Sequence, residues 1–316
     1  MTSTAESGSR PALVAFARDS IARGSKSFAL ASKLFDPVTR ERAWLLYAWC
    51  RACDDIVDGQ VMGHGMSPVA DAGARVEQVR ALTARALSGE ATGEPAFDAL
   101  GLVAAECGIP AALPQDVIDG FALDAAEWRP RGEADLLRYC YHVAGAVGVM
   151  MAIVMGVPAD DRATLDRACD LGLAFQLANI ARDLSEDDAA GRCYVPDEWL
   201  AEFDVPPGEL FRPVYRPRVA VIGRRLAGLA ERYEASARVG AAALPFRSAW
   251  AVLAAAGIYG GIAREVARRG PQAWDARVMI GKGEKLGHVA RALAQATQRG
   301  RLVGAARDPA LWTRNP

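Results

Sequence analysis

Residues 175–187 read FQLANIARDLSED, and four polar side chains in this stretch recur at helical spacing. Gln176, Asn179, Asp183 and Asp187 follow one another in steps of three, four and four, so they share one face of a helix. The residues around Gln176 and Asn179 are mostly apolar, which predicts a buried helix. An ordinary exposed polar face is the alternative, but a buried stripe of amide and carboxylate groups needs binding partners.

A second acidic stretch, YAWCRACDDIVD, runs from Tyr47 to Asp58. Asp54 and Asp58 are four residues apart and stack on one helix face, which Tyr47 and Arg51 continue toward the N-terminus. Arg51 is also spaced to meet Asp55. The alternative is a solvated helix end with an ion pair. Because acids near a helix C-terminus oppose the helix dipole, they favour a bound cation.

Together the two stretches predict a metal-assisted site. Carboxylate and amide oxygens without Cys or His are hard ligands that suit Mg²⁺, with Mn²⁺ as the alternative ion. Arg51 and Arg182 lie beside the two acidic stripes and offer planar guanidinium groups to phosphate oxygens. Two facing acidic helices would hold a diphosphate through several Mg²⁺ ions and favour ionisation of an allylic diphosphate.

Composition limits the classes of protein that remain. The chain has 316 residues, of which 51% are hydrophobic and 24% charged, which predicts a globular protein with a sizeable core. The formal net charge is −1. No overall field attracts nucleic acid, so we expect no nucleic-acid partner, and an anionic ligand must be held by a local cluster.

The cysteines indicate a reducing compartment, and the N-terminus and the apolar runs indicate how the protein relates to membranes. Of six cysteines only Cys50 and Cys53 form a CxxC pair, which lies in a helical stretch and is interpreted as structural. The first eleven residues lack the pattern of a signal peptide. The longest uncharged apolar runs, 143–158 and 248–263, are shorter than the roughly 20 residues needed to span a bilayer. We expect a cytoplasmic protein, membrane-associated only at its surface.

Helical periodicity dominates the chain and predicts an all-α fold. Irregular backbone is expected over 191–217, which holds five prolines. The predicted helices are 11–23, 38–58, 70–88, 95–106, 114–127, 133–156, 160–187, 216–239, 246–269 and 283–299.

Four segments, in order, resemble the squalene and phytoene synthase family. They are GSKSF at 24–28, the first acidic stretch, YCYHVAGAVG at 139–148, and QLANIARDLSED at 176–187. The resemblance extends from about Gly24 to Leu286. The segments YAWCRACDDIVDGQ and GRCYVPDEW, at 47–60 and 191–199, are most similar to bacterial phytoene synthases.

The resemblance implies a single-domain isoprenoid-synthase helical bundle around a central apolar cavity, spanning 11–305 between tails at 1–10 and 306–316. We expect the last ten residues to be frayed.

The resemblance also implies roles for individual residues. The implied metal ligands are Asp54, Asp58, Asn179, Asp183 and Asp187. The implied diphosphate-binding residues are Ser25, Lys26, Ser27, Arg51 and Arg182. The implied catalytic residues are Tyr47, Arg51, Asp54, Asp58, Asp183 and Asp187. Further substrate-binding residues implied by the resemblance are Phe28, Tyr139, Gln176, Tyr194, Tyr259, Arg277 and Lys285.

Each of these roles has a simpler alternative. Ser25 and Ser27 are also suited to capping a helix. Tyr47 and Tyr139 are equally suited to packing in the core. The small and apolar residues at 145–151 suit either the wall of a hydrocarbon slot or a tightly packed helix pair.

The resemblance implies a head-to-head condensation of two geranylgeranyl diphosphates to phytoene, the first step of carotenoid biosynthesis, through a cyclopropylcarbinyl (prephytoene) diphosphate. No strand–GxGxxG–helix unit is present, and no NADPH is expected. Alternatives are a dehydrosqualene, hydroxysqualene or squalene synthase acting on farnesyl diphosphate, and a terpene cyclase or head-to-tail elongase. A non-catalytic lipid-binding or assembly-factor relative is the remaining alternative.

The isoprenoid product implied by the resemblance is very apolar. Its exit is therefore expected to face a membrane, through a peripheral contact that serves product release. No strongly basic amphipathic helix marks that contact surface in the sequence.

Overall fold

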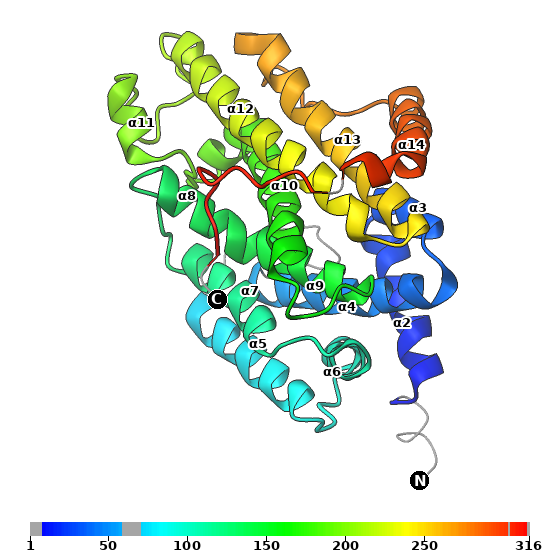
Figure 1. The fold of residues 1–316 in the computed structure, drawn as a ribbon. Helices are drawn as coiled ribbons and strands as arrows, with labels where there is room; N and C mark the ends of the chain where they lie inside the picture. The colour runs from blue at the N-terminus through cyan, green and yellow to red at the C-terminus, as the bar shows by residue number, and fades with distance from the viewer. Residues whose placement is uncertain (1–7, 59–70, 303, 315–316) are drawn as a thin grey trace. The chain divides into compact units, whose positions relative to one another are not determined.

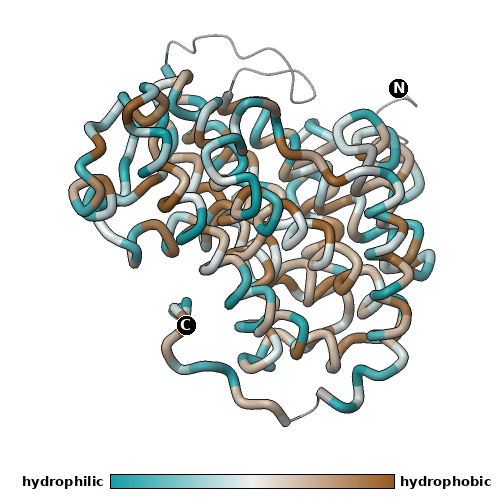
Figure 2. Tube along the Cα trace, turned by 90° about the horizontal axis from the view of Figure 1, so that it is seen from above, coloured by the Kyte–Doolittle hydropathy of each residue, from teal (hydrophilic) through white to brown (hydrophobic). Residues whose placement is uncertain are grey.

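A computed structural model describes residues 8–58, 71–302 and 304–314, and within these ranges it leaves out the side chains of Lys26, Ser27, Asp58 and Leu302. The described residues form helices and connecting turns and contain no strand (Figure 1). The predicted all-α class is confirmed. Hydrophobic and hydrophilic residues alternate along the helical turns, as amphipathic helices require (Figure 2).

Contacts between Cα atoms divide the chain into two compact units, of which the first comprises Met1–Ala126 and Val149–Arg162. Its helices are α2 (Arg10–Gly24), α3 (Lys26–Ala31), α4 (Pro37–Asp58), α5 (Ala72–Leu87), α6 (Pro95–Cys107) and α7 (Ala112–Ala125), with a short 3₁₀ turn at Ser32–Leu34. Helix α4 packs against α2, α5 and α6. It is therefore the central helix of this unit.

Helix α4 begins where the sequence supplies a cap. The Asp36 Oδ1 atom accepts hydrogen bonds from the backbone N–H groups of Val38 and Thr39, each at 3.0 Å. Pro37 occupies the first helical position, where its missing N–H group is not needed. Along its length the helix buries Trp49 and other apolar side chains. This start fixes the register that places the first acidic stretch at the far end of α4.

The second unit comprises Glu127–Gly148 and Ala163–Pro316. Its helices are α8 (Glu133–Cys140), α10 (Arg162–Ala189), α11 (Asp197–Glu202), α12 (Arg216–Gly240), α13 (Phe246–Arg269) and α14 (Lys282–Thr297), and α9 (Ala146–Val154) continues across the boundary. A π-helical turn at Tyr141–Gly145 joins α8 to α9. The α11 helix lies inside the stretch predicted to be irregular.

Glycines allow the π-helical turn and the start of α9 to lie directly on α10. A Cβ atom added to Gly148 would lie 2.5 Å from the carbonyl oxygen of Ala168, and one added to Gly145 would lie 2.8 Å from a Leu173 methyl carbon. On α10, a Cβ atom at Gly172 would overlap the backbone of Ala144. This part of 145–151 is therefore a tightly packed helix pair, one of the two alternatives that the sequence left open.

The described C-terminal residues are bound to the second unit rather than frayed. Arg307 forms an ion pair with Asp170 of α10, and Arg314 lies 3.0 Å from Asp166 of the same helix. The Tyr233 hydroxyl accepts a hydrogen bond from the backbone N–H of Trp312 at 3.1 Å. The expectation of a frayed end thus differs from the structure, because basic side chains near the terminus meet the buried Asp170 and the partly buried Asp166 of α10.

Two helical stretches, Glu133–Val154 and Phe246–Gln272, are long and apolar enough to cross a membrane. In their most apolar windows, 61% and 56% of the residues are buried within the protein. Core helices of soluble proteins meet the same criterion, so this observation alone is weak evidence for spanning. It is compatible with the expected surface association.

Candidate active site

The GSKSF segment forms the joint between α2 and α3. The Ser25 Oγ atom accepts a hydrogen bond from the backbone N–H of Phe28 at 3.2 Å, which is the geometry of a helix N-cap. The capping alternative for Ser25 is therefore confirmed, and diphosphate binding by this residue stays a prediction. The side chains of Lys26 and Ser27 lie outside the described residues.

Helices α2 and α4 approach closely at Gly24. A Cβ atom at this position would overlap the hydroxyl oxygen of Tyr47, so a larger residue would have to displace the Tyr47 ring. The Phe28 and Tyr47 rings lie with their centroids 5.6 Å apart. Burial raises the pKa of the Tyr47 phenol, although the nearby Arg51 opposes the shift. The first unit thus brings together three predicted site residues: Phe28, Tyr47 and Arg51.

The first acidic stretch ends α4 as predicted. Arg51 forms an ion pair with Asp54, and its Nε atom lies 3.7 Å from the Asp55 carboxylate. The Asp54 side chain is 40% exposed, whereas that of Arg51 is 16% exposed. A cation that reaches Asp54 would therefore compete with Arg51, and a phosphate that reaches Arg51 would compete with Asp54. Asp58 is the last residue of α4, and its side chain lies outside the described residues.

The second acidic stretch lies on α10. The Oδ1 atom of Asn179 is buried and has no hydrogen-bond partner. Leaving a buried amide oxygen unsatisfied costs about 1–3 kcal/mol unless a ligand binds to it. This orphaned oxygen is a hard donor, and its chemistry fits a Mg²⁺ ion.

Two arginines hold the Asp183 carboxylate. Arg182 forms an ion pair with it from the neighbouring position, and Arg277 approaches to 2.9 Å. Arg277 also lies 3.3 Å from the carboxylate of Glu186. The structure therefore brings Arg277, which follows α13, to the acidic face of α10. Such a cluster of guanidinium groups and carboxylates can bind a diphosphate together with its cations.

Tyr259 of α13 lies on the same part of α10. Its ring stacks on Phe175 with the centroids 4.1 Å apart and an interplanar angle of 20°. Burial raises the pKa of the Tyr259 phenol, and the positive charge of Arg182 opposes the shift. Tyr259 is therefore placed among the predicted site residues of the second unit.

Three aromatic rings form a stack that the sequence predicts only in part. The Tyr139 and Tyr194 rings lie 4.9 Å apart at 21°, and Trp128 stacks on Tyr139 at 5.9 Å and 20°. Tyr139 and Tyr194 were predicted site residues, whereas Trp128 was missed. No helical spacing relates Trp128 to either tyrosine, because Trp128 lies in the connection between α7 and α8 and its contact with Tyr139 depends on how that connection folds against α8. The stack presents flat aromatic surface of the kind that stabilises a nearby cation.

Two further predicted site residues are placed by their helices. Gln176 shares the α10 face with Asn179, and Lys285 lies in the first turn of α14. Among the described residues, no group of three or more His, Cys, Asp or Glu side chains forms a metal-binding arrangement. The predicted ligand set includes the Asn179 amide, and the Asp58 side chain lies outside the described residues. The ligand set and the facing of the two acidic stretches, which belong to different units, stay predictions.

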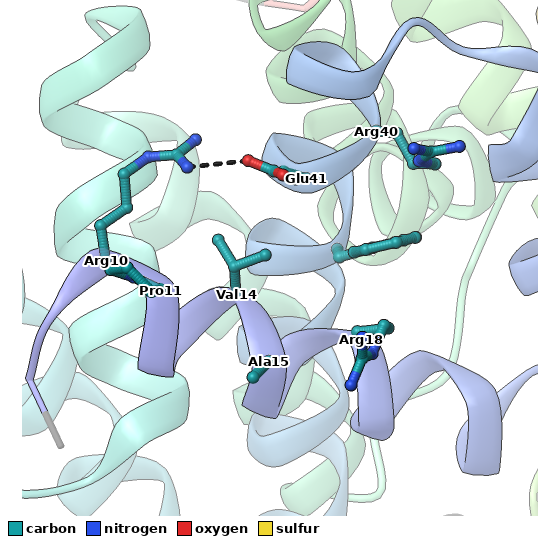
Figure 3. A pocket seen from close by; sticks show the side chains of 8 residues that line it. Arg10, Pro11, Val14, Ala15, Arg18, Arg40 and Glu41 are labelled. Atoms are coloured by element: carbon teal, nitrogen blue, oxygen red, sulfur yellow. Dashed lines mark hydrogen bonds and ion pairs between the residues drawn. The ribbon is translucent and has the colours of Figure 1, made fainter.

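A surface cavity of about 470 Å³ lies between α2 and α4, away from the predicted site residues (Figure 3). Arg10 and Glu41 form an ion pair at 2.7 Å on its wall. The Arg40 Nε atom is buried and unpartnered, and the guanidinium lies 5.5 Å from the Trp44 ring centre. None of the predicted site residues lines this cavity, so it is separate from the candidate active site.

The helical fold and the two acidic stripes with adjacent arginines define an enzyme of the isoprenoid-synthase class. The sequence model of the squalene/phytoene synthase family matches residues 21–284 and extends through both units, and the chain belongs to this family.

Curated relatives match along nearly their whole length. The chain is 44% identical over 308 residues to a phytoene synthase of Pseudescherichia vulneris, covering 97% of this chain and 99% of the relative. It is 47% identical over 293 residues to a 15-cis-phytoene synthase of Enterobacter agglomerans, covering 92% and 98%. A crystal structure of a dehydrosqualene synthase with a ligand superposes with a TM-score of 0.81 at 25% identity, over 92% of this chain and 98% of that one.

Proposed function

We propose that this chain is a prenyltransferase that condenses two geranylgeranyl diphosphates to 15-cis-phytoene, the first step of carotenoid biosynthesis. The observation that carries the proposal is full-length identity of 44–47% to four curated bacterial phytoene synthases. The retained acidic stripes, with their arginines and aromatic rings, support the same reaction. They also speak against a non-catalytic relative, which would be expected to lose its metal ligands.

We propose Mg²⁺ as the resident cation, with Mn²⁺ as the alternative ion. When bound, the metal withdraws electron density from the diphosphate leaving group. The residues that would hold it are Asp54, Asp58, Asn179, Asp183 and Asp187. The buried Asn179 oxygen that lacks a partner is the structural support for this ligand set.

The arginines would bind and orient the diphosphate groups. Arg182 and Arg277 already meet at Asp183, so phosphate oxygens can replace or share these carboxylate contacts with little rearrangement of charge. Arg51 would act in the same way beside Asp54. Pairing each arginine with a carboxylate before the substrate arrives keeps the charges aligned for the leaving group.

The aromatic side chains would line the hydrocarbon part of the site. Phe28 and Tyr47 form one pair of rings, and Tyr139 and Tyr194 form part of another stack. Rings can stabilise a carbocation through their faces without reacting with it. They also exclude water, which directs the reaction toward proton loss rather than capture by water.

We place the protein in the cytoplasm, in peripheral contact with a membrane. The hydrocarbon product would have almost no solubility in water, so a nearby bilayer would receive it. The four apolar isoprenoid units of each substrate tail favour the same location.

A product assay tests the proposal. Purified protein is incubated with Mg²⁺ and geranylgeranyl or farnesyl diphosphate in detergent, with and without NADPH, and the hydrocarbon is identified by mass spectrometry. Phytoene from the twenty-carbon substrate without NADPH is expected. Dehydrosqualene, hydroxysqualene or squalene from the fifteen-carbon substrate would instead assign the chain to a sister activity, of which the structurally similar dehydrosqualene synthase is one example.

A matched pair of variants shows whether the product depends on the proposed site. Asp183→Asn removes a charge that two arginines contact, and we expect product formation to fall by at least about 100-fold. Asp119→Asn makes the same chemical change at a half-exposed residue of α7 and should leave activity unchanged. Equal activity in the two variants would refute the assignment of Asp183.

A further inference from the structure

In helix α14 the small apolar residues face the core and the large ones face outward, which is the opposite of the usual arrangement. Ala292 and Ala296 are 1% and 0% exposed, whereas Leu286 and Leu293 are 71% and 38% exposed. The two leucines are seven residues apart and therefore share a face. A helix that only covers a core places its large apolar side chains inward. The outward leucines of α14 thus remain available to a partner.

The apolar character of this face extends beyond the helix. Met279, three residues before α14, is 74% exposed. Ala290, which is also exposed, lies between the leucines on the same face. Of the seven large hydrophobic side chains exposed in the described parts of the chain, three lie between Met279 and Leu293. Scattered exposed hydrophobic residues are ordinary, but such a cluster indicates an interaction surface.

Basic side chains accompany the cluster. Lys282 is one turn before Leu286 on the same face, and Arg291 is exposed within the helix. The only acid of α14, Glu284, is engaged at the helix start, where its Oε2 atom accepts a hydrogen bond from the Gly281 N–H at 2.9 Å. Apolar side chains with lysine and arginine around them match the apolar and anionic layers of a membrane surface.

The helix is held firmly in place and is connected to the candidate active site. The Trp250 indole of α13 donates a hydrogen bond to the Val289 carbonyl oxygen at 2.9 Å, and α14 lies along α13 (Figure 1). In the segment that leads into α14, Arg277 contacts Asp183, Val278 is buried and Met279 is exposed. Only one residue separates the arginine at the acidic stripe from the exposed methionine.

We propose that Met279, Leu286, Leu293 and the flanking Lys282 and Arg291 form a membrane-docking face that binds bilayers containing anionic lipids. The proposal deepens the peripheral membrane contact proposed above and rests on that part of the proposed function. The apolar side chains enter the interfacial region, and the basic groups remain at the level of the phosphates. The charges favour a lipid surface over a second copy of this chain, because two copies of this basic face would repel each other.

Flotation with lipid vesicles tests the docking face. Purified full-length protein is mixed with vesicles of phosphatidylcholine alone or with phosphatidylglycerol, and the bound fraction is measured after density-gradient centrifugation. We expect binding to the anionic vesicles that weakens as salt increases. Met279→Ser with Leu286→Ser should lower the partition constant by about tenfold or more, and Lys282→Glu with Arg291→Glu should do the same for anionic vesicles only.

Val214→Ser is the matched control, because Val214 is 68% exposed in the same unit but lies outside α14. It should bind vesicles as well as the wild type does. Vesicle binding that is unchanged in both double variants would overturn the proposal. Sedimentation that shifts from dimer to monomer in Met279→Ser with Leu286→Ser would also overturn it, since the face would then bind a second copy.

Activity in detergent keeps this test separate from the catalytic proposal. None of the four substituted residues belongs to the proposed site, so each double variant should make product from detergent-dispersed substrate at the wild-type rate. Loss of vesicle binding with full activity in detergent supports the docking face. A wild type that binds vesicles as expected but makes no product would refute the catalytic proposal and leave the docking face standing.

Discussion

The guanidinium of Arg307 forms two parallel hydrogen bonds with the carboxylate of Asp170, from Nε to Oδ2 at 2.8 Å and from Nη2 to Oδ1 at 2.7 Å. Asp170 lies in α10 and is 0% exposed, and the Ser236 hydroxyl donates a further hydrogen bond to it at 2.5 Å. Burial raises the pKa of Asp170, while Arg307 and Ser236 oppose the shift. The C-terminal segment therefore supplies the charge that a buried acid of α10 requires.

Replacing Arg307 should destabilise the protein strongly. Arg307→Met leaves the Asp170 carboxylate buried without its charged partner, and breaking such a pair costs about 3–5 kcal/mol. The free energy of unfolding, measured by urea titration, gives the size of the loss. Arg232→Met is the control, because Arg232 meets Asp308 at 3.3 Å with both side chains about half exposed, and it should cost at most about 1 kcal/mol. Similar losses in the two variants would contradict the prediction.

A methyl group at Gly148 should disturb the contact between α9 and α10. The new Cβ atom would lie 2.5 Å from the Ala168 carbonyl oxygen, and backbone cannot move aside as a flexible side chain can. We expect Gly148→Ala to lower stability by about 1–3 kcal/mol. Gly228→Ala in α12 meets nothing within 4 Å and should instead stabilise by about 0.4–1 kcal/mol. Thermal unfolding of both variants shows whether their effects have opposite signs.

Removing the Asn179 amide should weaken metal binding more than it weakens the fold. The Oδ1 atom has no protein partner to lose, so Asn179→Ala should change the free energy of unfolding in the absence of metal by less than about 1 kcal/mol. If this oxygen binds Mg²⁺, the concentration for half-maximal activity should rise by about tenfold or more. Gln295→Ala removes an amide that pairs with Arg238 at 2.8 Å and should leave that concentration unchanged. An unchanged requirement in Asn179→Ala would exclude Asn179 as a ligand.

Stability should fall as the pH drops through the range in which His288 titrates. Burial lowers the pKa of His288 from 6.5, as do Arg291, Arg264 and Arg238, against the opposite effect of Glu234. The unfolded chain therefore binds the proton more readily than the folded protein does. The stabilising contribution is present above about pH 6.5 and is lost as the pH falls through the lower folded-state value. The free energy of unfolding of His288→Gln should vary less between pH 8 and pH 5, and an equal slope would refute the assignment.

Periodicity predicted the helices α4 and α10 that carry the two acidic stretches. It could not show which face of a helix points outward. In α14, Leu286 and Leu293 have the spacing of a buried stripe, yet the alanines beside them form the contact with the core. The inward side is the one that α13 packs against, and that contact is not visible in the sequence of α14 alone.

The sequence also did not predict contacts between residues that do not share a helix. Nothing local to Trp128 predicts its stacking on Tyr139. Likewise Arg307, which lies in an apparently polar tail, meets an acid 137 positions earlier. Short elements were missed for a different reason, because the six residues of α3 and of α11 are too few to show a periodicity of 3.6.

In the π-helical turn at Tyr141–Gly145, chain length is more critical than residue identity at the positions before Gly145. A wide turn accommodates one residue more than an α-helix does, and each residue of an α-helix turns the chain by about 100°. Deleting one residue here would restore regular winding and rotate Tyr139 relative to Gly148. The helix could then keep the stack of Tyr139 on Tyr194 or the contact of Gly148 with α10, but not both. Apart from Gly145, which packs closely on α10, residues of the turn should therefore tolerate substitution far better than the turn tolerates a single-residue deletion.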